Sequence, residues 1–379
     1  MNITRRKFIR YGSLAGTGFA FAACSSQTPS STLSTSASST TASASGEVLK
    51  AGFVYVGPVG DFGWTYAHDQ GRKKMEENLK GRVTSTVVES VNEGADSERV
   101  IRQLVTSGCK MIVGTAFGYM DPMIKVAKDF PDVAFLHCGG YKRAANVETF
   151  LGRFEEPRYL TGMIAGRMTK SNVIGYIGGF PIPQVVRGIG AFTLGLRETN
   201  PQATVKVIWL QSWYDPAKER EAALSLISQG ADVLSQNTDS TAIVQAAEEK
   251  GVYAFGYNSD MSKFGPKAHL TAAVHDWAPY YTKTAEAILA DNWKAGDVWA
   301  GMKDGVEDIS PLNPVVPENV KKQVMAKRQE FIDGKALAFK GPIKDQAGTI
   351  KVPSGQALSD KDQLAMNWYV EGVQGQLPK

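Results

Sequence analysis

The sequence contains few of the residues that build metal sites or disulfide frameworks. Its 379 residues include three cysteines and four histidines, and their spacing matches no metal-binding pattern. We therefore expect neither a metal nor a cofactor. Cys109 and Cys138 each lie in or beside an apolar run. We expect buried free thiols, although a disulfide between them stays open in an exported protein.

Motifs of the common enzyme classes are also absent from the sequence. It has no glycine-flanked serine elbow, no HExxH, no Walker glycine loop and no GxGxxG at a strand–helix junction. His68 follows Thr65 by three residues on an expected helix. It could reach a cleft, but we expect a solvated or capping side chain. These absences favour a binding protein over an enzyme.

The chain carries no excess of charge outside its N-terminus. The full sequence has 42 Lys and Arg against 38 Asp and Glu, and residues 1–23 hold four of the basic residues and none of the acidic ones. The rest of the chain is therefore neutral, which gives no sign of a nucleic-acid partner.

Long apolar runs are missing from the N-terminal region as well. The run at 14–23 is too short for a bilayer core, which needs about 20 apolar residues. It follows the paired arginines Arg5 and Arg6 and precedes Cys24. This order is typical of a twin-arginine-like lipoprotein signal over 1–23, with lipidation at Cys24. The alternative is a chance basic-apolar N-terminus followed by an ordinary buried cysteine.

Residues 24–46 are mostly Ser, Thr and Ala, which are too polar to pack and predict a flexible tether. The protein is then expected to be exported and lipid-anchored to a membrane, facing the periplasm or the cell exterior. The remaining chain, roughly 330 residues, is long enough for two lobes.

From residue 48 onward, short apolar runs alternate with amphipathic segments. The pattern predicts strands at 48–56, 83–89, 111–114, 133–137, 173–177, 205–210, 233–235 and 252–257. It predicts helices at 65–79, 96–107, 122–128, 185–198, 216–228 and 241–249. Such alternation indicates an α/β fold of doubly wound parallel sheets with helices on both faces. Residues 104–108 are similar in sequence to residues 226–230, and this internal similarity supports two similar lobes.

Aromatic residues recur where the predicted strands end. Ligands of open parallel sheets bind beyond the carboxyl ends of the strands, and Trp64, Phe117 and Trp213 lie at such ends. An indole in a loop is either a lid on the core or a stacking platform. Two indoles on different lobes, each near an Asp, favour a flat aromatic ligand held between them.

Acidic and amide side chains accompany these aromatic residues. Asp61, Asn258 and Asp260 stand at strand ends, and Glu156 lies at the expected crossover between the lobes. A carboxylate can accept hydrogen bonds from ring N–H or exocyclic NH₂ groups. The alternative for Glu156, and for its neighbour Glu155, is capping of a helix N-terminus.

Several stretches together carry a resemblance to a known family; they are 59–71, 154–166, 178–181, 213–218, 230–233 and 256–261. The chain resembles the basic membrane protein (BMP) family of substrate-binding lipoproteins of ABC importers, which bind purine nucleosides or bases. The resemblance implies a type I periplasmic-binding fold with two lobes and three crossovers. We expect 47–153 and about 260–315 in the first lobe, and 154–259 and about 316–379 in the second.

The resemblance also implies roles for single residues. In that family a purine lies between two aromatic rings, and an acid in the crossover segment recognises the edge of the purine by hydrogen bonding. Trp64 and Trp213 match the two ring positions, and Glu156 matches the base-reading acid. Asp61 and Asp260 match further acids of the family.

One position departs from the family pattern. Nucleoside-binding members carry a lysine that touches ribose, and this chain has His275 in its place. Trp replaces Phe at both stacking positions and enlarges the ring platforms. Both departures favour a free base such as adenine over a nucleoside.

The sequence thus predicts a monomeric receptor that binds a purine and passes it to an ABC permease. One alternative is a nucleoside or sugar receptor of the same fold, because Trp, Asp and Asn side chains also suit sugar hydroxyls. Another is an exported nucleoside hydrolase, which would need a carboxylate cluster or metal ligands at one strand end.

Overall fold

The computed structural model describes residues 48–378. The predicted signal at 1–23, the lipidated Cys24 and the tether at 24–46 lie outside these described residues. Within 48–378, no helix has both the length and the apolar character that crossing a membrane requires.

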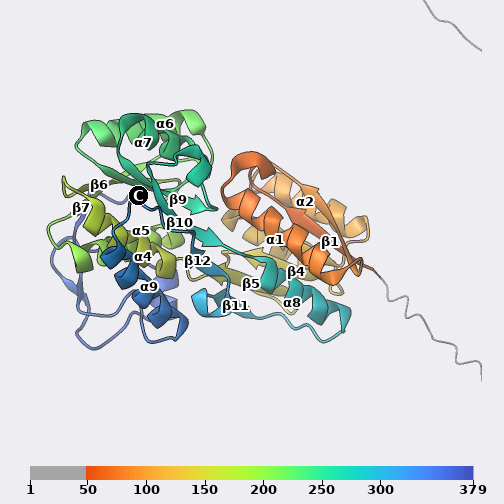
Figure 1. Ribbon diagram of the computed structural model, residues 1–379. Helices are drawn as coiled ribbons and strands as arrows, with labels where there is room; N and C mark the ends of the chain where they lie inside the picture. The colour runs from red at the N-terminus through yellow and green to blue at the C-terminus, as the bar shows by residue number, and fades with distance from the viewer. Residues whose placement is uncertain (1–47, 379) are drawn as a thin grey trace, which may run out of the picture. The chain divides into compact units, whose positions relative to one another are not determined.

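The first lobe is built on a six-stranded sheet whose strands are all parallel (Figure 1). In spatial order the strands are β11 (Asp297–Ala300), β5 (Val147–Gly152), β4 (Ala134–Cys138), β3 (Met111–Gly114), β1 (Leu49–Val54) and β2 (Val83–Val88). One face is covered by α1 (Trp64–Leu79) and α8 (Ala278–Leu289), and the other by α2 (Ala95–Thr106) and α3 (Met120–Ala127). Phe53 of β1 faces the α1 side and Val54 the α2 side, so both faces are buried, as in most parallel sheets.

The second lobe is built on a seven-stranded sheet (Figure 1). In spatial order the strands are β12 (Glu307–Ile309), β10 (His269–His275), β9 (Tyr253–Asn258), β8 (Val233–Asn237), β6 (Val173–Gly178), β7 (Thr204–Trp209) and β15 (Val373–Gln374). β12 runs antiparallel to β10, and the other pairs are parallel. One face is covered by α4 (Glu155–Met168), α5 (Pro183–Thr199) and α9 (Glu318–Ile332), and the other by α6 (Pro216–Ser228) and α7 (Ala242–Lys250). The predicted fold class, with two doubly wound lobes, is confirmed.

The chain crosses between the lobes three times: at 152–155 between β5 and α4, at 275–278 between β10 and α8, and at 300–307 between β11 and β12. The predicted assignment of 260–315 to the first lobe is wrong in part. β10 and β12 pair within the second sheet, and Leu270 of β10 packs in the hydrophobic core of the second lobe. Of that stretch, α8 and β11 pack in the first lobe.

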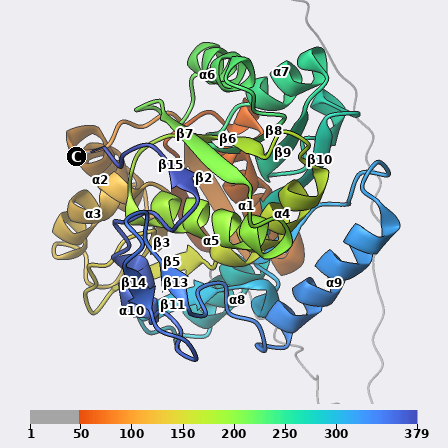
Figure 2. The ribbon, with the colours of Figure 1, turned by 90° about the vertical axis from the view of Figure 1, so that its left-hand side faces the viewer.

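The C-terminal segment covers one edge of the second sheet. β15 lies beside β7 and pairs with it in parallel (Figure 2), which leaves less of this edge open to pairing with another chain. Before it come the hairpin of β13 (Ile343–Lys344) and β14 (Ile350–Val352) and the short α10 (Asp360–Leu364). Asp360 of α10 pairs with Arg153 of the first crossover at 2.7 Å, so this segment also contacts the connection between the lobes.

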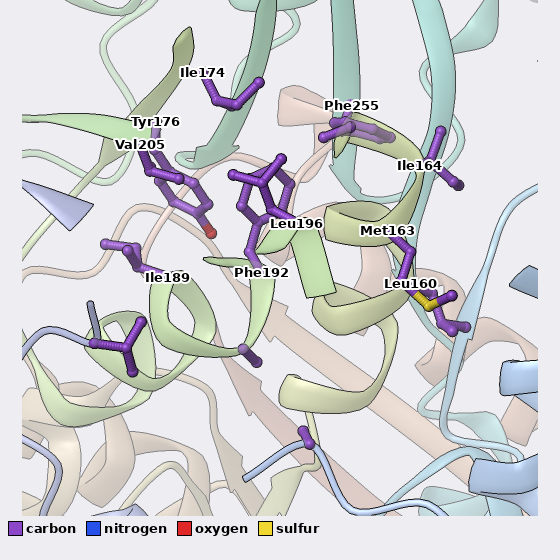
Figure 3. Packing of buried hydrophobic residues seen from close by; sticks show 14 of the residues in the cluster. Leu160, Met163, Ile164, Ile174, Tyr176, Ile189, Phe192, Leu196, Val205 and Phe255 are labelled. Atoms are coloured by element: carbon purple, nitrogen blue, oxygen red, sulfur yellow. The ribbon is translucent and has the colours of Figure 1, made fainter. Parts of the chain in front are cut away.

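Helices α4 and α5 approach closely because glycines face the partner's backbone. A Cβ on Gly162 would lie 2.0 Å from the carbonyl oxygen of Phe192, and one on Gly195 would lie 2.0 Å from that of Tyr159. Figure 3 shows the resulting core, with Leu160 of α4 and Phe192 of α5 among its side chains.

Gly162→Val is expected to lower the free energy of unfolding by about 3 kcal/mol, because the added side chain must displace a carbonyl group of α5. Urea unfolding followed by circular dichroism measures the change. Gly60→Val is the matched control, since its Cβ meets no atom within 4 Å. Equal stability of the Gly162 variant and the wild type would contradict this close helix packing.

Candidate functional site between the lobes

A cavity lies between the two lobes, beyond the carboxyl ends of both sheets. Its volume, counted as the space open to the centre of a water-sized sphere, is about 40 Å³. From the first lobe, its lining residues are Val56, Trp64, Thr115, Ala116, Phe117 and Cys138. From the second lobe, they are Ile182, Gln184, Val185, Trp213, Asn237, Asp239 and Tyr257.

Trp64 and Trp213 bring one indole from each lobe to this cavity. Trp64 is the first residue of α1, and its Nε1 donates to the carbonyl oxygen of Thr115 at 2.6 Å, which orients the ring. Trp213 follows β7, and its ring centroid lies 4.9 Å from that of Phe180. Both indoles are half-buried and also pack against the core of their own lobe. Each indole therefore covers the core of its lobe and also lines the cavity.

Two carboxylates, one from each lobe, hold the N-terminus of α1. Asp61 accepts hydrogen bonds from the backbone N–H groups of Gly63 at 2.7 Å and Tyr66 at 3.0 Å. Asp239, from the second lobe, accepts from the backbone N–H of Trp64 at 3.1 Å. Burial raises the pKa of Asp61 to about 6. Burial, and then the charge of Asp61, raise the pKa of Asp239 well above its ordinary value.

Asp61, Asn258 and Asp260 are not among the described residues that line the cavity. Asp61 caps α1, and Asn258 donates from Nδ2 to Oδ1 of Asp239 at 3.0 Å. Asp260 is 44% exposed and accepts from the backbone N–H of Ser262 at 2.9 Å. Contacts within the protein thus engage all three side chains that we predicted as ligand contacts.

Glu156 is also not among the described residues that line the cavity. It lies in the first turn of α4 and accepts from the backbone N–H of Met302 at 2.7 Å, which joins the first crossover to the third. Burial raises its pKa to about 7. Its neighbour Glu155 forms a buried ion pair with Arg187 at 3.1 Å. Both glutamates lie in the first turn of α4, where the helix dipole favours negative charge, but no side-chain hydrogen bond caps this helix.

The histidines lie deeper than the sequence predicted. His275, in the second crossover, has Nδ1 2.7 Å from Oε2 of Glu307, and both side chains are fully buried. Burial lowers the pKa of His275 to about 3 and raises that of Glu307. His68 was expected at the surface, but it is fully buried, with its ring stacked on Trp277 at 4.6 Å and its Nδ1 2.6 Å from the hydroxyl of Tyr281.

Three of the eight predicted ligand residues, Trp64, Trp213 and Phe117, therefore meet at the cavity. The sequence reasoning missed Asp239 and Asn237, which also line it. The sequence contained a signal for both residues, because they follow the predicted strand at 233–235. Polar residues that follow a parallel strand face the cleft.

Cys109 and Cys138 are buried free thiols, as predicted, and the disulfide alternative is wrong. Cys138 lines the cavity, and burial raises the pKa of its thiol well above the ordinary value, which keeps it unreactive. In the part of the chain that the structure describes, no group of three or more His, Cys, Asp or Glu side chains could hold a metal ion.

Comparisons of the sequence identify its family. The model of the Bmp family, described as ABC transporter substrate-binding protein PnrA-like, matches residues 48–337, so the chain belongs to this family. A purine-binding protein of Brucella abortus is 48% identical over 333 residues, which cover 88% of this chain and 95% of that protein. A Haloferax volcanii protein, named provisionally as an ABC transporter glucose-binding protein, is 40% identical over 336 residues, covering 88% of this chain and 82% of that protein.

Solved structures of ABC transporter solute-binding proteins share the fold. One from Conexibacter woesei has a TM-score of 0.62 at 23% identity and covers 76% of this chain and 98% of its own. One from Aeropyrum pernix has a TM-score of 0.65 at 18% identity and covers 84% of this chain and 98% of its own. These likenesses confirm the periplasmic-binding-protein fold that the sequence predicted.

Glu156→Gln is expected to make the protein more stable than the wild type near pH 7.5 and equally stable near pH 4. The folded-state pKa of Glu156 is about 7 against an ordinary 4.5, so the wild type loses stability as pH rises between these values. Gln keeps an acceptor for Met302 without this loss. The gain has a ceiling of about 3 kcal/mol.

Thermal unfolding of both proteins at half-unit pH steps measures this difference. Glu318→Gln is the control, because Glu318 is exposed and its pKa is lowered by Lys321; it should give no gain. The ranking of ligands should stay the same in the Glu156 variant. A changed ranking would instead support the base-reading role.

Proposed function

We propose that this member of the PnrA-like substrate-binding family is the receptor of an ABC importer for a purine base such as adenine, held between Trp64 and Trp213. The observation that carries the proposal is the cavity between the lobes, to which each lobe contributes one indole. Stacking on an aromatic side chain stabilises a bound base by about 1–3 kcal/mol. The name of the Brucella abortus relative, a purine-binding protein, supports the ligand class.

Binding is expected to favour lobe closure by rotation about the three crossovers. The closed receptor, a monomer in this proposal, would deliver the base to the permease. Lipidation of Cys24 and the tether at 24–46 would keep it near the membrane, provided that more than one acyl chain is attached.

A purine nucleoside is an alternative ligand of the same class, because it carries the purine ring that the two indoles at this cavity would hold. A sugar receptor is the second candidate, since the relative from Haloferax volcanii is named for glucose and an indole can also support a sugar ring. A nucleoside hydrolase is disfavoured, because Asp239 is the one carboxylate among the described residues that line the cavity.

Calorimetry of the purified protein with adenine, hypoxanthine, adenosine and glucose tests the proposal. Saturable binding of a base, with weaker binding of adenosine, is the expected result. Saturable binding of glucose without a response to any purine would overturn the purine assignment. Release of free base from adenosine would show a hydrolase.

Trp213→Ala is expected to weaken adenine binding about five- to 150-fold, the equivalent of one lost stacking contact. Trp368→Ala is the matched control, because Trp368 is a half-buried indole of the same lobe that does not belong to the cavity lining. Calorimetry measures affinity and differential scanning fluorimetry measures stability. Unchanged adenine affinity in the Trp213 variant would show that this indole is not a stacking platform.

Trp64 needs a smaller substitution, because its ring also packs on His68 at 4.4 Å and on Trp277 at 5.8 Å. Trp64→Phe should keep most of this packing while it loses the hydrogen bond to Thr115 and part of the ring platform. We expect a melting temperature near that of the wild type and weaker adenine binding. Equal affinity with equal stability would assign Trp64 to the core alone.

A further inference from the structure

Asp239 is held in place by the loop that carries it. This loop follows β8, and the buried Glu219 of α6 binds the residues on both sides of Asp239. It accepts from the hydroxyl of Thr238 at 3.0 Å and from the hydroxyl of Ser240 at 2.7 Å. The backbone N–H of Asp239 donates to the carbonyl oxygen of Trp213 at 2.9 Å. Asp239 is therefore fixed beside one of the two indoles.

The two oxygens of the Asp239 carboxylate have different surroundings. Oδ1 accepts from the backbone N–H of Trp64 at 3.1 Å and from Nδ2 of Asn258 at 3.0 Å. Within residues 48–378, no protein group donates to Oδ2, although the residue is only 5% exposed and lines the cavity. Oδ2 is not among the buried atoms that lack a partner in this part of the chain, so it keeps accessible surface at which water or a ligand can donate to it.

The bond to Trp64 joins the lobes at a point of close approach. A Cβ on Gly63 would lie 2.4 Å from the carbonyl oxygen of Asp239, so the α1 loop and the β8 loop meet with no room for a larger side chain. Nearby, the hydroxyl of Ser259 donates to the carbonyl oxygen of Phe62. Oδ1 of Asp239 is thus part of the contact between the lobes, and Oδ2 is not.

We propose that Asp239 determines the ligand specificity of this receptor: Oδ1 holds the lobes together through α1, while Oδ2 accepts a hydrogen bond from an amino group of the bound base. This inference rests on the proposed function and names its ligand class, an aminopurine. An ionised carboxylate can only accept, so it favours adenine, with an amino group at the edge facing Oδ2, over hypoxanthine, with a carbonyl there.

The groups around Asp239 make this preference depend on pH. Asp61 faces it from the α1 loop and Glu219 from α6, and Tyr214 and Tyr257 face it from the β7–α6 loop and from β9. Burial and the charge of Asp61 raise its pKa. Protonation turns an acceptor into a donor, so the preference for adenine over hypoxanthine should increase as pH rises from 5 to 9.

Asp239→Asn tests the proposal directly, because it changes one atom that faces the cavity. Asn Oδ1 can still accept from Trp64 and Asn258, while Nδ2 replaces Oδ2 with a donor. Adenine binding should weaken about ten- to a hundredfold, the effect of losing a hydrogen bond to a charged group. Hypoxanthine should lose less, and the ratio of the two affinities should no longer depend on pH.

Calorimetry with adenine and hypoxanthine at pH 5, 7 and 9 gives this ratio for the wild type, Asp239→Asn and the control Asp260→Asn. Asp260 is an exposed acid of the same lobe, outside the cavity lining, and its variant should match the wild type. A wild type that binds no purine would overturn the proposed function. A wild type that binds purines, with the same ratio in Asp239→Asn, would overturn this inference alone.

Discussion

The structure of the site depends on the N-terminus of α1, where a carboxylate from each lobe accepts from backbone N–H groups of residues 63–66. Two buried carboxylates close together normally repel each other, but the helix N-terminus offers consecutive donors and a favourable dipole. Trp64 begins this helix. Its backbone N–H binds Asp239, and its indole N–H binds Thr115. The contact between the lobes and the orientation of the indole are therefore set by one residue.

The crossovers use the same chemistry away from the cavity. Glu156 accepts from the backbone N–H of Met302, and His275 contacts Glu307. Buried carboxylates therefore connect the first and second crossovers to the third crossover. Burying such groups costs stability unless they keep their partners. Rotation of the lobes is consequently expected to occur between arrangements in which these bonds persist. The acids of the crossovers are better explained by support of the hinge than by contact with a ligand.

Local patterns in the sequence predicted much of the fold. Helix α6 and strand β3 begin and end at the predicted residues, 216–228 and 111–114, because apolar periodicity and turn residues are local properties. The placement of 260–315 was wrong in part, since the pairing of β10 with β9 and β12 depends on contacts between distant segments. Periodicity shows that a strand exists; it does not show which sheet the strand joins.

Acids at strand ends look alike in the sequence, and the difference between them lies in the donors that the fold supplies. Asp61 and Asp260 are each followed within three residues by the start of a helix or a 3-10 turn, and each caps it. Asp239 stands in a similar position before α7. There, however, Ser240 accepts from the backbone N–H of Ala242, while Glu219 from the distant α6 binds the hydroxyl of Ser240. Since another side chain caps α7, Asp239 can reach across to the first lobe and line the cavity.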